Sequence, residues 1–153
     1  MKKLNRKGFT LIELLAIIVI LAIIMVVTIP TVLGSLGTAR QDTFRNSANT
    51  VAEFVEKQYT LYLANPNDAS LDANLKTNSY AKVGTASNFT AASLTAAGVK
   101  SSNYAIGNKT TVKIYTSGRA CIKLTAHTDG DFGSVTKKTV CSSGCLAADC
   151  TEA

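Results

Sequence analysis

Apolar residues fill the start of the chain almost without interruption. From Phe9 to Leu33 the sequence reads FTLIELLAIIVILAIIMVVTIPTVL, in which Glu13 is the one charged residue. Folded as an α-helix, residues 9–29 would be about 31 Å long at 1.5 Å per residue, close to the thickness of the hydrocarbon core of a bilayer. The run is long for a signal peptide and ends in no small-residue cleavage site. The pattern therefore predicts a membrane-spanning helix that is retained.

A second hydrophobic pattern follows at helical spacing. Six apolar or aromatic residues recur every three or four positions, which marks one face of an α-helix. They are Phe44, Ala48, Val51, Val55, Tyr59 and Tyr62. Asn65-Pro66-Asn67-Asp68 then predicts the end of this helix. We expect an amphipathic helix whose apolar face is covered by the rest of the chain, with Arg45, Asn49, Glu56 and Lys57 on its other faces.

Pro30 lies between these two patterns. Proline removes a backbone donor and clashes with the preceding turn, and Gly34 and Gly37 weaken a helix further. The sequence predicts a kink, or a locally unwound segment, between Thr28 and Gly37, after which the helix resumes. A simple helix end is the alternative.

The remainder of the chain predicts a small antiparallel sheet that follows a long connection. The connection is rich in Ala, Ser, Thr and Asn and contains one short helix at Ala91–Gly98. Alternating apolar and polar residues predict strands at 111–115, 120–126 and 135–141, with room for a fourth strand. The expected fold class is α+β, a long helix packed on a sheet of three or four strands.

Positive charge is concentrated at the N-terminus. The 153-residue chain has 16 Lys and Arg residues against 10 Asp and Glu, a net charge of +6. Four of the basic residues precede Gly8, so the rest of the chain has 12 against 10 and a net charge of +2. A basic tip before an apolar run is typical of a membrane segment whose positive end stays in the cytoplasm. The nearly neutral remainder gives little reason to propose nucleic acid as the main ligand.

Glu13 is the unusual residue of the apolar run. A carboxylate placed in hydrocarbon costs a few kcal/mol, so an acidic residue at this depth is a candidate functional residue. No cation lies between Phe9 and Leu33. The partner of Glu13 must therefore come from the basic tip, from another chain or from a newly made N-terminus.

The residues around Glu13 carry a resemblance to a known family. The stretch Lys7-Gly8-Phe9-Thr10-Leu11-Ile12-Glu13, followed by the apolar run and Pro30, resembles the N-terminus of type IV pilins and pseudopilins. The resemblance covers about the first 35 residues. A plain signal anchor is the alternative.

This resemblance implies how the chain is processed. A prepilin peptidase would cut after Gly8, and Phe9 would become the N-methylated first residue. Glu13 would then be the fifth mature residue, which pairs with the N-terminal amine of a neighbouring subunit, and Pro30 the twenty-second, where the family often has a helix-kinking proline. The expected segments are a leader (1–8), a transmembrane and filament-core helix (9–33), an amphipathic helix (34–65) and a globular head (66–153) that comprises the connection (66–110) and the sheet (111–153).

Four cysteines in the last third of the chain predict two disulfides in an exported domain. Zinc is the rival interpretation, although the spacing lacks the usual pair of C-x2-C knuckles. If the two last strands pair about a loop centred near Asp131, Cys121 lies opposite Cys141, which leaves Cys145 to pair with Cys150. The competing arrangement, seen in the C-terminal loop of many pilins, joins Cys141 to Cys150 and Cys121 to Cys145. We favour the first arrangement.

No constellation of catalytic residues is evident, so we expect no enzyme activity, cofactor or metal. The single histidine, His127, lies in a polar turn. Asp129 and Asp131 faintly resemble part of a calcium loop but lack further acidic ligands. The Lys137-Lys138 pair supplies too little charge to bind DNA strongly.

The sequence and the resemblance together predict a structural subunit of a type IV pilus. The expected partners are identical and related pilins, prepilin peptidase, the inner-membrane assembly platform and its ATPase, and membrane lipid before assembly. The expected location is the bacterial cytoplasmic membrane, with a cytoplasmic N-terminus, and then the surface pilus. A pseudopilin of a type II secretion or DNA-uptake apparatus is one alternative, and a monomeric membrane-anchored binding protein is another.

Overall fold

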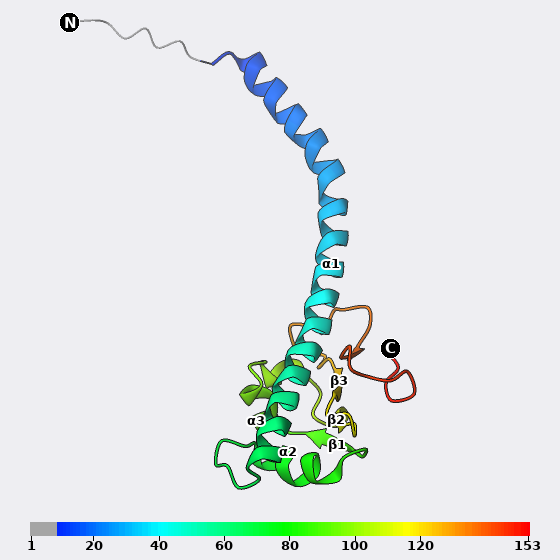
Figure 1. Cartoon of the computed structure of the whole chain (residues 1–153). Helices are drawn as coiled ribbons and strands as arrows, with labels where there is room; N and C mark the ends of the chain where they lie inside the picture. The colour runs from blue at the N-terminus through cyan, green and yellow to red at the C-terminus, as the bar shows by residue number, and fades with distance from the viewer. Residues whose placement is uncertain (1–8) are drawn as a thin grey trace, which may run out of the picture. The chain divides into compact units, whose positions relative to one another are not determined.

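The computed structural model describes residues 9–153, which form two units that divide between Thr38 and Ala39. We call residues 9–38 the N-terminal unit and residues 39–153 the head unit, and each is described by itself. One helix, α1 (Leu11–Ala64), contributes residues to both units (Figure 1). The predicted leader, residues 1–8, lies outside the described residues.

The N-terminal unit consists of apolar helix whose side chains have no cover within the unit. Every large apolar side chain from Phe9 to Leu36 is between 47% and 83% exposed. Among the described residues, α1 is the one helix that is long and apolar enough to cross a membrane. Apolar surface of this extent requires lipid or other apolar helices around it.

The helix continues through Pro30 without a break, and residues 28–37 are all helical. The expected local unwinding is therefore wrong, whereas the kink stays a prediction. Hydroxyl groups on both sides of the proline bond backbone carbonyls of their own turns: Thr28 donates to Ile24 (2.9 Å) and Thr31 donates to Thr28 (2.8 Å). Such bonds are compatible with a continuous helix, so the proline removes one backbone hydrogen bond while the flanking turns stay intact.

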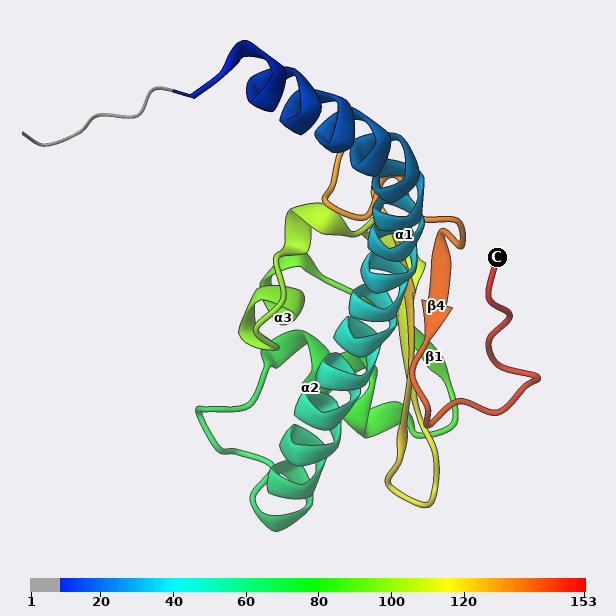
Figure 2. The same cartoon turned by 90° about the horizontal axis from the view of Figure 1, so that it is seen from above.

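The head unit combines the second half of α1 with a four-stranded antiparallel sheet in the order β1-β2-β3-β4. The strands are β1 (Ala86–Phe89), β2 (Gly107–Ile114), β3 (Ala120–Thr125) and β4 (Thr139–Cys141). The short helices are α2 (Ala73–Asn78), η1 (Tyr80–Lys82), α3 (Ala91–Ala96) and η2 (Ser101–Asn103). Figure 2 shows this part of α1 running alongside the strands, and the strand order places β4 at one edge of the sheet. The α+β fold class is confirmed.

The predicted connection contains more regular structure than expected. It holds the fourth strand, β1, which pairs with β2 through Asn88 and Thr111. The predicted short helix is confirmed as α3; Thr90 caps it by accepting the N–H of Ser93 at 3.1 Å, and Gly98 follows it with φ +82°. Phe89 anchors the strand because its side chain is 1% exposed in the core.

The last strand, β4, is shorter than predicted. The main chain of Lys137 hydrogen-bonds to a side chain of α1 and does not pair with β3. The side-chain amide of Gln41 accepts the Lys137 N–H at 3.0 Å and donates to the Lys137 carbonyl at 3.4 Å. The N–H and the C=O of Lys137 are therefore both hydrogen-bonded to α1. Pairing with β3 begins at Thr139, which lies opposite Thr125.

The core lies between α1 and the inner face of the sheet. The predicted stripe on α1 is confirmed: Phe44, Ala48, Val51 and Val55 are fully buried, and Tyr59 and Tyr62 pack against the core from its margin. The sheet contributes alternate residues to the same cluster, namely Val112, Ile114, Ile122, Leu124 and Val140. Burial of this apolar area is the main stabilising contribution to the head unit.

Gly144 offers a test of how tightly the C-terminal segment packs on β3. A Cβ atom at this position would lie 2.5 Å from the carbonyl oxygen of Ala120, a backbone atom that cannot swing away. We expect Gly144→Ala to lower the free energy of unfolding by about 1–3 kcal/mol. The neighbouring exposed Ser143→Ala should change it by less than about 0.5 kcal/mol. Thermal unfolding of the full chain in detergent micelles would measure both, and equal stabilities would contradict this packing.

Candidate functional site

The motif residues at the start of α1 form a reciprocal hydrogen-bonded cap. Phe9 and Thr10 lie outside the helix, and Glu13 lies in its first turn. The Thr10 N–H and the Thr10 hydroxyl both donate to Glu13 Oε2, each at 2.9 Å, and the Glu13 N–H reaches the Thr10 hydroxyl oxygen at 3.4 Å. This is a capping box, in which two residues satisfy donors that the helix start leaves unpaired. Gly8, the predicted cleavage residue, lies outside the described residues.

The cap uses only one of the two oxygens of the Glu13 carboxylate. No hydrogen bond within residues 9–153 reaches Oε1, and Phe9 is 77% exposed. A carboxylate half-satisfied by its own helix loses less on entering an apolar medium than a bare one. The remaining oxygen keeps the capacity to accept a cationic donor.

Sequence reasoning missed Thr10, although a signal for it was present. Thr10-x-x-Glu13 directly before an apolar run matches the capping-box pattern of Ser or Thr followed three residues later by an acidic residue. The Glu13 side chain therefore has a local hydrogen-bonding role in addition to its charge.

All four cysteines form disulfides, but the favoured pairing is wrong. The structure joins Cys121 to Cys145 and Cys141 to Cys150, which is the competing arrangement. The register of the sheet explains the difference: Cys141 lies opposite Lys123, and Cys121 lies opposite Lys113 on the other neighbouring strand. Cys121 and Cys141 therefore do not lie opposite each other, as a loop centred near Asp131 would require.

Residues 144–153, here called the strap, are tied to the sheet on both sides of their central turn. Asp149 accepts hydrogen bonds from Lys113 Nζ at 2.6 Å and from the Tyr115 hydroxyl at 2.5 Å. The Tyr115 oxygen in turn accepts the N–H of Leu146 at 3.0 Å. These bonds favour the ionised carboxylate and hold the pKa of Asp149 below its usual range.

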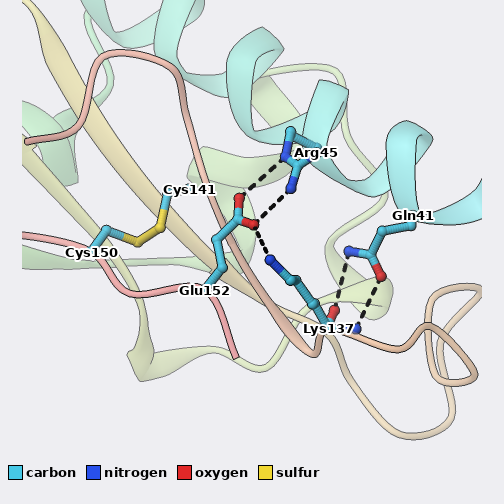
Figure 3. Close-up of polar contacts among 6 residues, drawn as sticks. All are labelled: Gln41, Arg45, Lys137, Cys141, Cys150 and Glu152. Atoms are coloured by element: carbon cyan, nitrogen blue, oxygen red, sulfur yellow. Dashed lines mark hydrogen bonds and ion pairs between the residues drawn. A yellow bond between two sulfur atoms is a disulfide. The ribbon is translucent and has the colours of Figure 1, made fainter. Parts of the chain in front are cut away.

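Glu152 ties the far end of the strap to α1 (Figure 3). Its carboxylate accepts from Arg45 Nη2 at 2.6 Å and Nε at 3.2 Å, and from Lys137 Nζ at 3.0 Å. The Arg45 hydrogen bonds, opposed by partial burial and supported by Lys137, lower the pKa of Glu152 from 4.5 to about 2. A bidentate arginine pair of this kind fixes geometry as well as charge.

One polar flank of α1 carries these contacts along the head unit. Gln41 bonds the backbone of Lys137, Arg45 binds Glu152, Asn49 accepts the Ser143 N–H at 2.8 Å, and Glu56 accepts the Ala120 N–H at 2.8 Å. The helical pattern had placed Arg45, Asn49 and Glu56 away from the core. The pattern could not show that these three residues face the sheet edge and the strap, because their partners lie 64 or more positions away in sequence.

Two of the other candidate residues, Asp129 and Asp131, line an open cleft of about 760 Å³. Arg40 and Thr43 form one wall, and residues 128–134 form the other. The Asp131 carboxylate accepts a hydrogen bond from the Asn103 side chain at 3.0 Å, so it already has a partner within the head unit. Lys138 Nζ donates to the Gly133 carbonyl. Among the described residues, no group of three or more His, Cys, Asp and Glu side chains is placed to hold a metal ion.

The Thr10–Glu13 cap can be tested with an isosteric variant. Thr10→Val removes the hydroxyl and should cost the helix start about 1 kcal/mol. Amide hydrogen exchange of residues 12–14 in detergent micelles should become about fivefold faster. Thr10→Ser keeps the hydroxyl and should exchange like the parent chain. Equal exchange in all three chains would show that the cap contributes nothing to the helix start.

Glu152 should make the stability of the head unit depend on acid pH. Its folded-state pKa of about 2 lies below the ordinary value of 4.5, so its stabilising effect is complete above pH 4.5 and is lost as the pH falls toward 2. We expect no more than about 1 kcal/mol, because the Arg45 and Lys137 side chains are 42% and 50% exposed and solvent screens both ion pairs.

Thermal unfolding between pH 7 and pH 2 measures this contribution as a difference between variants, since Asp149 also has a lowered pKa. Glu152→Gln should lower Tm at pH 7, and its Tm should converge with that of the parent chain near pH 2. Glu53→Gln, on an exposed part of α1, is the matched control and should follow the parent chain. A constant difference between Glu152→Gln and the parent chain would contradict the assignment.

Comparison with known proteins concerns the N-terminal segment. Residues 3–29 match the family described as the prokaryotic N-terminal methylation motif, which is the signal motif of type IV pilins and pseudopilins. No curated protein and no solved structure matches the chain. Proteins marked by this motif are structural and are not enzymes. Together with the apolar helix, the motif fits anchoring in a membrane before assembly. The chain therefore bears the N-terminal signal of the type IV pilin-like proteins, a class that includes the pseudopilins.

Proposed function

We propose that the chain is a structural subunit of a type IV pilus, processed after Gly8 and polymerised through the apolar part of α1 into a surface filament. The observation that supports this most directly is the methylation motif at residues 3–29, which runs into a helix that is apolar on all sides. The N-methylated residue would be Phe9. Prepilin peptidase and pilus assembly components are the partners that such a motif implies in general terms.

Glu13 gives the proposed assembly its register. Cleavage after Gly8 would leave a free α-amino group on Phe9, and methylation would keep that amine basic. An amine and a carboxylate that meet between adjacent helices satisfy each other and offset the cost of burying either alone. A helix docked one turn out of place would leave both charges unpaired in an apolar medium. The capping of Glu13 Oε2 by Thr10 leaves the other oxygen for this contact.

The head unit has properties that suit a filament subunit under load. Two disulfides cross-link β3, β4 and the strap, and they limit how far this part of the chain can be extended. In the proposed filament the helices bury the apolar surface, and the heads face the exterior.

A pseudopilin of a type II secretion or DNA-uptake apparatus is the second candidate, because the same motif marks both groups. Both candidates share processing after Gly8 and assembly through α1, and they differ in the length and place of the filament. A monomeric membrane-anchored binding protein would keep Met1 and form no filament.

Two measurements test the proposal together. Mass spectrometry of the mature chain from its native membrane should find N-methylated Phe9 at the N-terminus. Electron microscopy of sheared surface material should find filaments that contain this chain. Long surface filaments support the pilus, short filaments at the membrane support the pseudopilin, and an unprocessed chain that begins with Met1 would overturn both.

Glu13→Ala separates processing from assembly. We expect the variant to be cleaved after Gly8 and N-methylated like the parent chain, but to form at most about one tenth as many filaments, since unpaired charge in an apolar medium costs more than the 1.4 kcal/mol that a tenfold loss requires. Glu53→Ala, which removes a carboxylate from an exposed part of the same helix, is the control and should assemble normally. Normal filaments from Glu13→Ala would contradict the pairing.

A further inference from the structure

The two disulfides of the head unit differ in how well the surrounding residues protect them. Cys121 is 3% exposed on β3, and its partner Cys145 has its Sγ 3.6 Å from the Ser142 hydroxyl and 3.7 Å from the Ile122 carbonyl oxygen. Cys145 itself is half-buried, as are Cys141 and Cys150, so Cys121 is the one buried cysteine of the four. A thiolate attacks a disulfide at a sulfur that it can reach. The Cys141–Cys150 bond has a half-buried cysteine at both ends, whereas the Cys121–Cys145 bond has one at Cys145 alone and polar groups close to its sulfur.

The residues that follow Cys150 close one edge of the sheet. Ala153 exchanges two backbone hydrogen bonds with Thr139, from Thr139 N–H at 2.8 Å and from its own N–H at 3.3 Å. Strand β4 is the last strand of the sheet, so Ala153 occupies a position where a further strand would pair. Glu152 holds this position against Arg45 and Lys137.

We propose that the Cys141–Cys150 disulfide is a redox-sensitive latch that keeps the end of the strap on α1 and on the β4 edge. The Arg45 and Lys137 side chains are 42% and 50% exposed, and ion pairs at such exposure contribute little. Ordering the backbone of residues 151–153 costs more conformational entropy than these pairs return. The disulfide lowers this entropic cost. It holds Glu152 two residues from a covalent anchor, and so keeps its carboxylate at high effective concentration beside Arg45.

Opening the latch is confined to the last few residues. Asp149 precedes Cys150 and stays bound to Lys113 and Tyr115, and Cys145 stays bound to Cys121. The strap up to Asp149 therefore remains on the sheet, while residues 150–153 leave α1 and β4. A free strand edge is a template for pairing with another chain, so the β4 edge is closed only in the oxidised protein.

The chemistry requires a dithiol reductant, such as the Cys-x-x-Cys pair of a thiol–disulfide oxidoreductase. One thiolate of the reductant attacks the sulfur of Cys141 or Cys150, and the other cysteine leaves as a thiolate that takes up a proton. The second thiol of the reductant then attacks the mixed disulfide. Two electrons pass from the dithiol to the protein, which gains two thiols while the reductant becomes a disulfide. The latch applies equally to a pilus and to a pseudopilus subunit.

Graded reduction of the full chain in detergent micelles tests the order of opening. The chain has no free cysteine among the described residues, so every thiol that appears reports a broken disulfide. Samples exposed to rising concentrations of dithiothreitol would be alkylated and mapped by mass spectrometry. We expect Cys141 and Cys150 to be alkylated at least ten times faster than Cys121 and Cys145. Equal rates, or earlier labelling of Cys121 and Cys145, would overturn the proposal.

Hydrogen exchange tests whether the disulfide holds the edge. In Cys141→Ser/Cys150→Ser, the amide of Thr139 should exchange at least tenfold faster, while the amides of residues 44–55 and of β3 keep their protection. In the matched control Cys121→Ser/Cys145→Ser, Thr139 should stay protected. If either variant fails to fold, the same exchange measured on the partly reduced parent chain decides. Unchanged protection of Thr139 once Cys141 and Cys150 are reduced would contradict the latch.

Discussion

The packing of the apolar stripe of α1 on the inner face of the sheet sets most other contacts of the head unit. Phe44, Val51 and Val55 are fully buried there, and a helix that turns this face to the sheet has the directions of its other faces decided as well. One flank, with Gln41, Arg45, Asn49 and Glu56, then lies beside the sheet edge and the strap. The outward face, which includes Asp42, Glu53 and Lys57, remains exposed.

In the N-terminal unit the same helix has large apolar side chains on every side. No other part of that unit covers them, in contrast to the buried stripe of the head unit. Large side chains that are 47–83% exposed cannot be satisfied within the unit that carries them. Their cover must be lipid or other chains, which agrees with the membrane anchoring that the N-terminal motif implies. Glu13 is compatible with such surroundings because Thr10 already satisfies one of its oxygens.

The strap shows how a segment with few apolar residues is held on a small domain. Its anchors are two disulfides, the Asp149 carboxylate between Lys113 and Tyr115, and the Glu152 carboxylate between Arg45 and Lys137. Each ion pair alone would be weak. Cross-links between them keep the partners close, so the covalent and ionic contacts reinforce one another.

The sequence by itself determined the parts of this protein that depend on short-range spacing. The apolar run, the buried stripe from Phe44 to Val55, the α3 helix, the motif residues Phe9 and Glu13 and the α+β class follow from patterns within a few turns or strands. The Thr10–Glu13 cap was also readable at this range. Only the tertiary structure decided the disulfide pairing, the late start of β4 at Thr139 and the partners of Arg45 and Glu56. Each of these depends on strand register or on which helix flank meets the sheet. The partners of Arg45 and Glu56 lie 107 and 64 positions away in sequence, and the packing of the whole domain, not a local rule, brings them together.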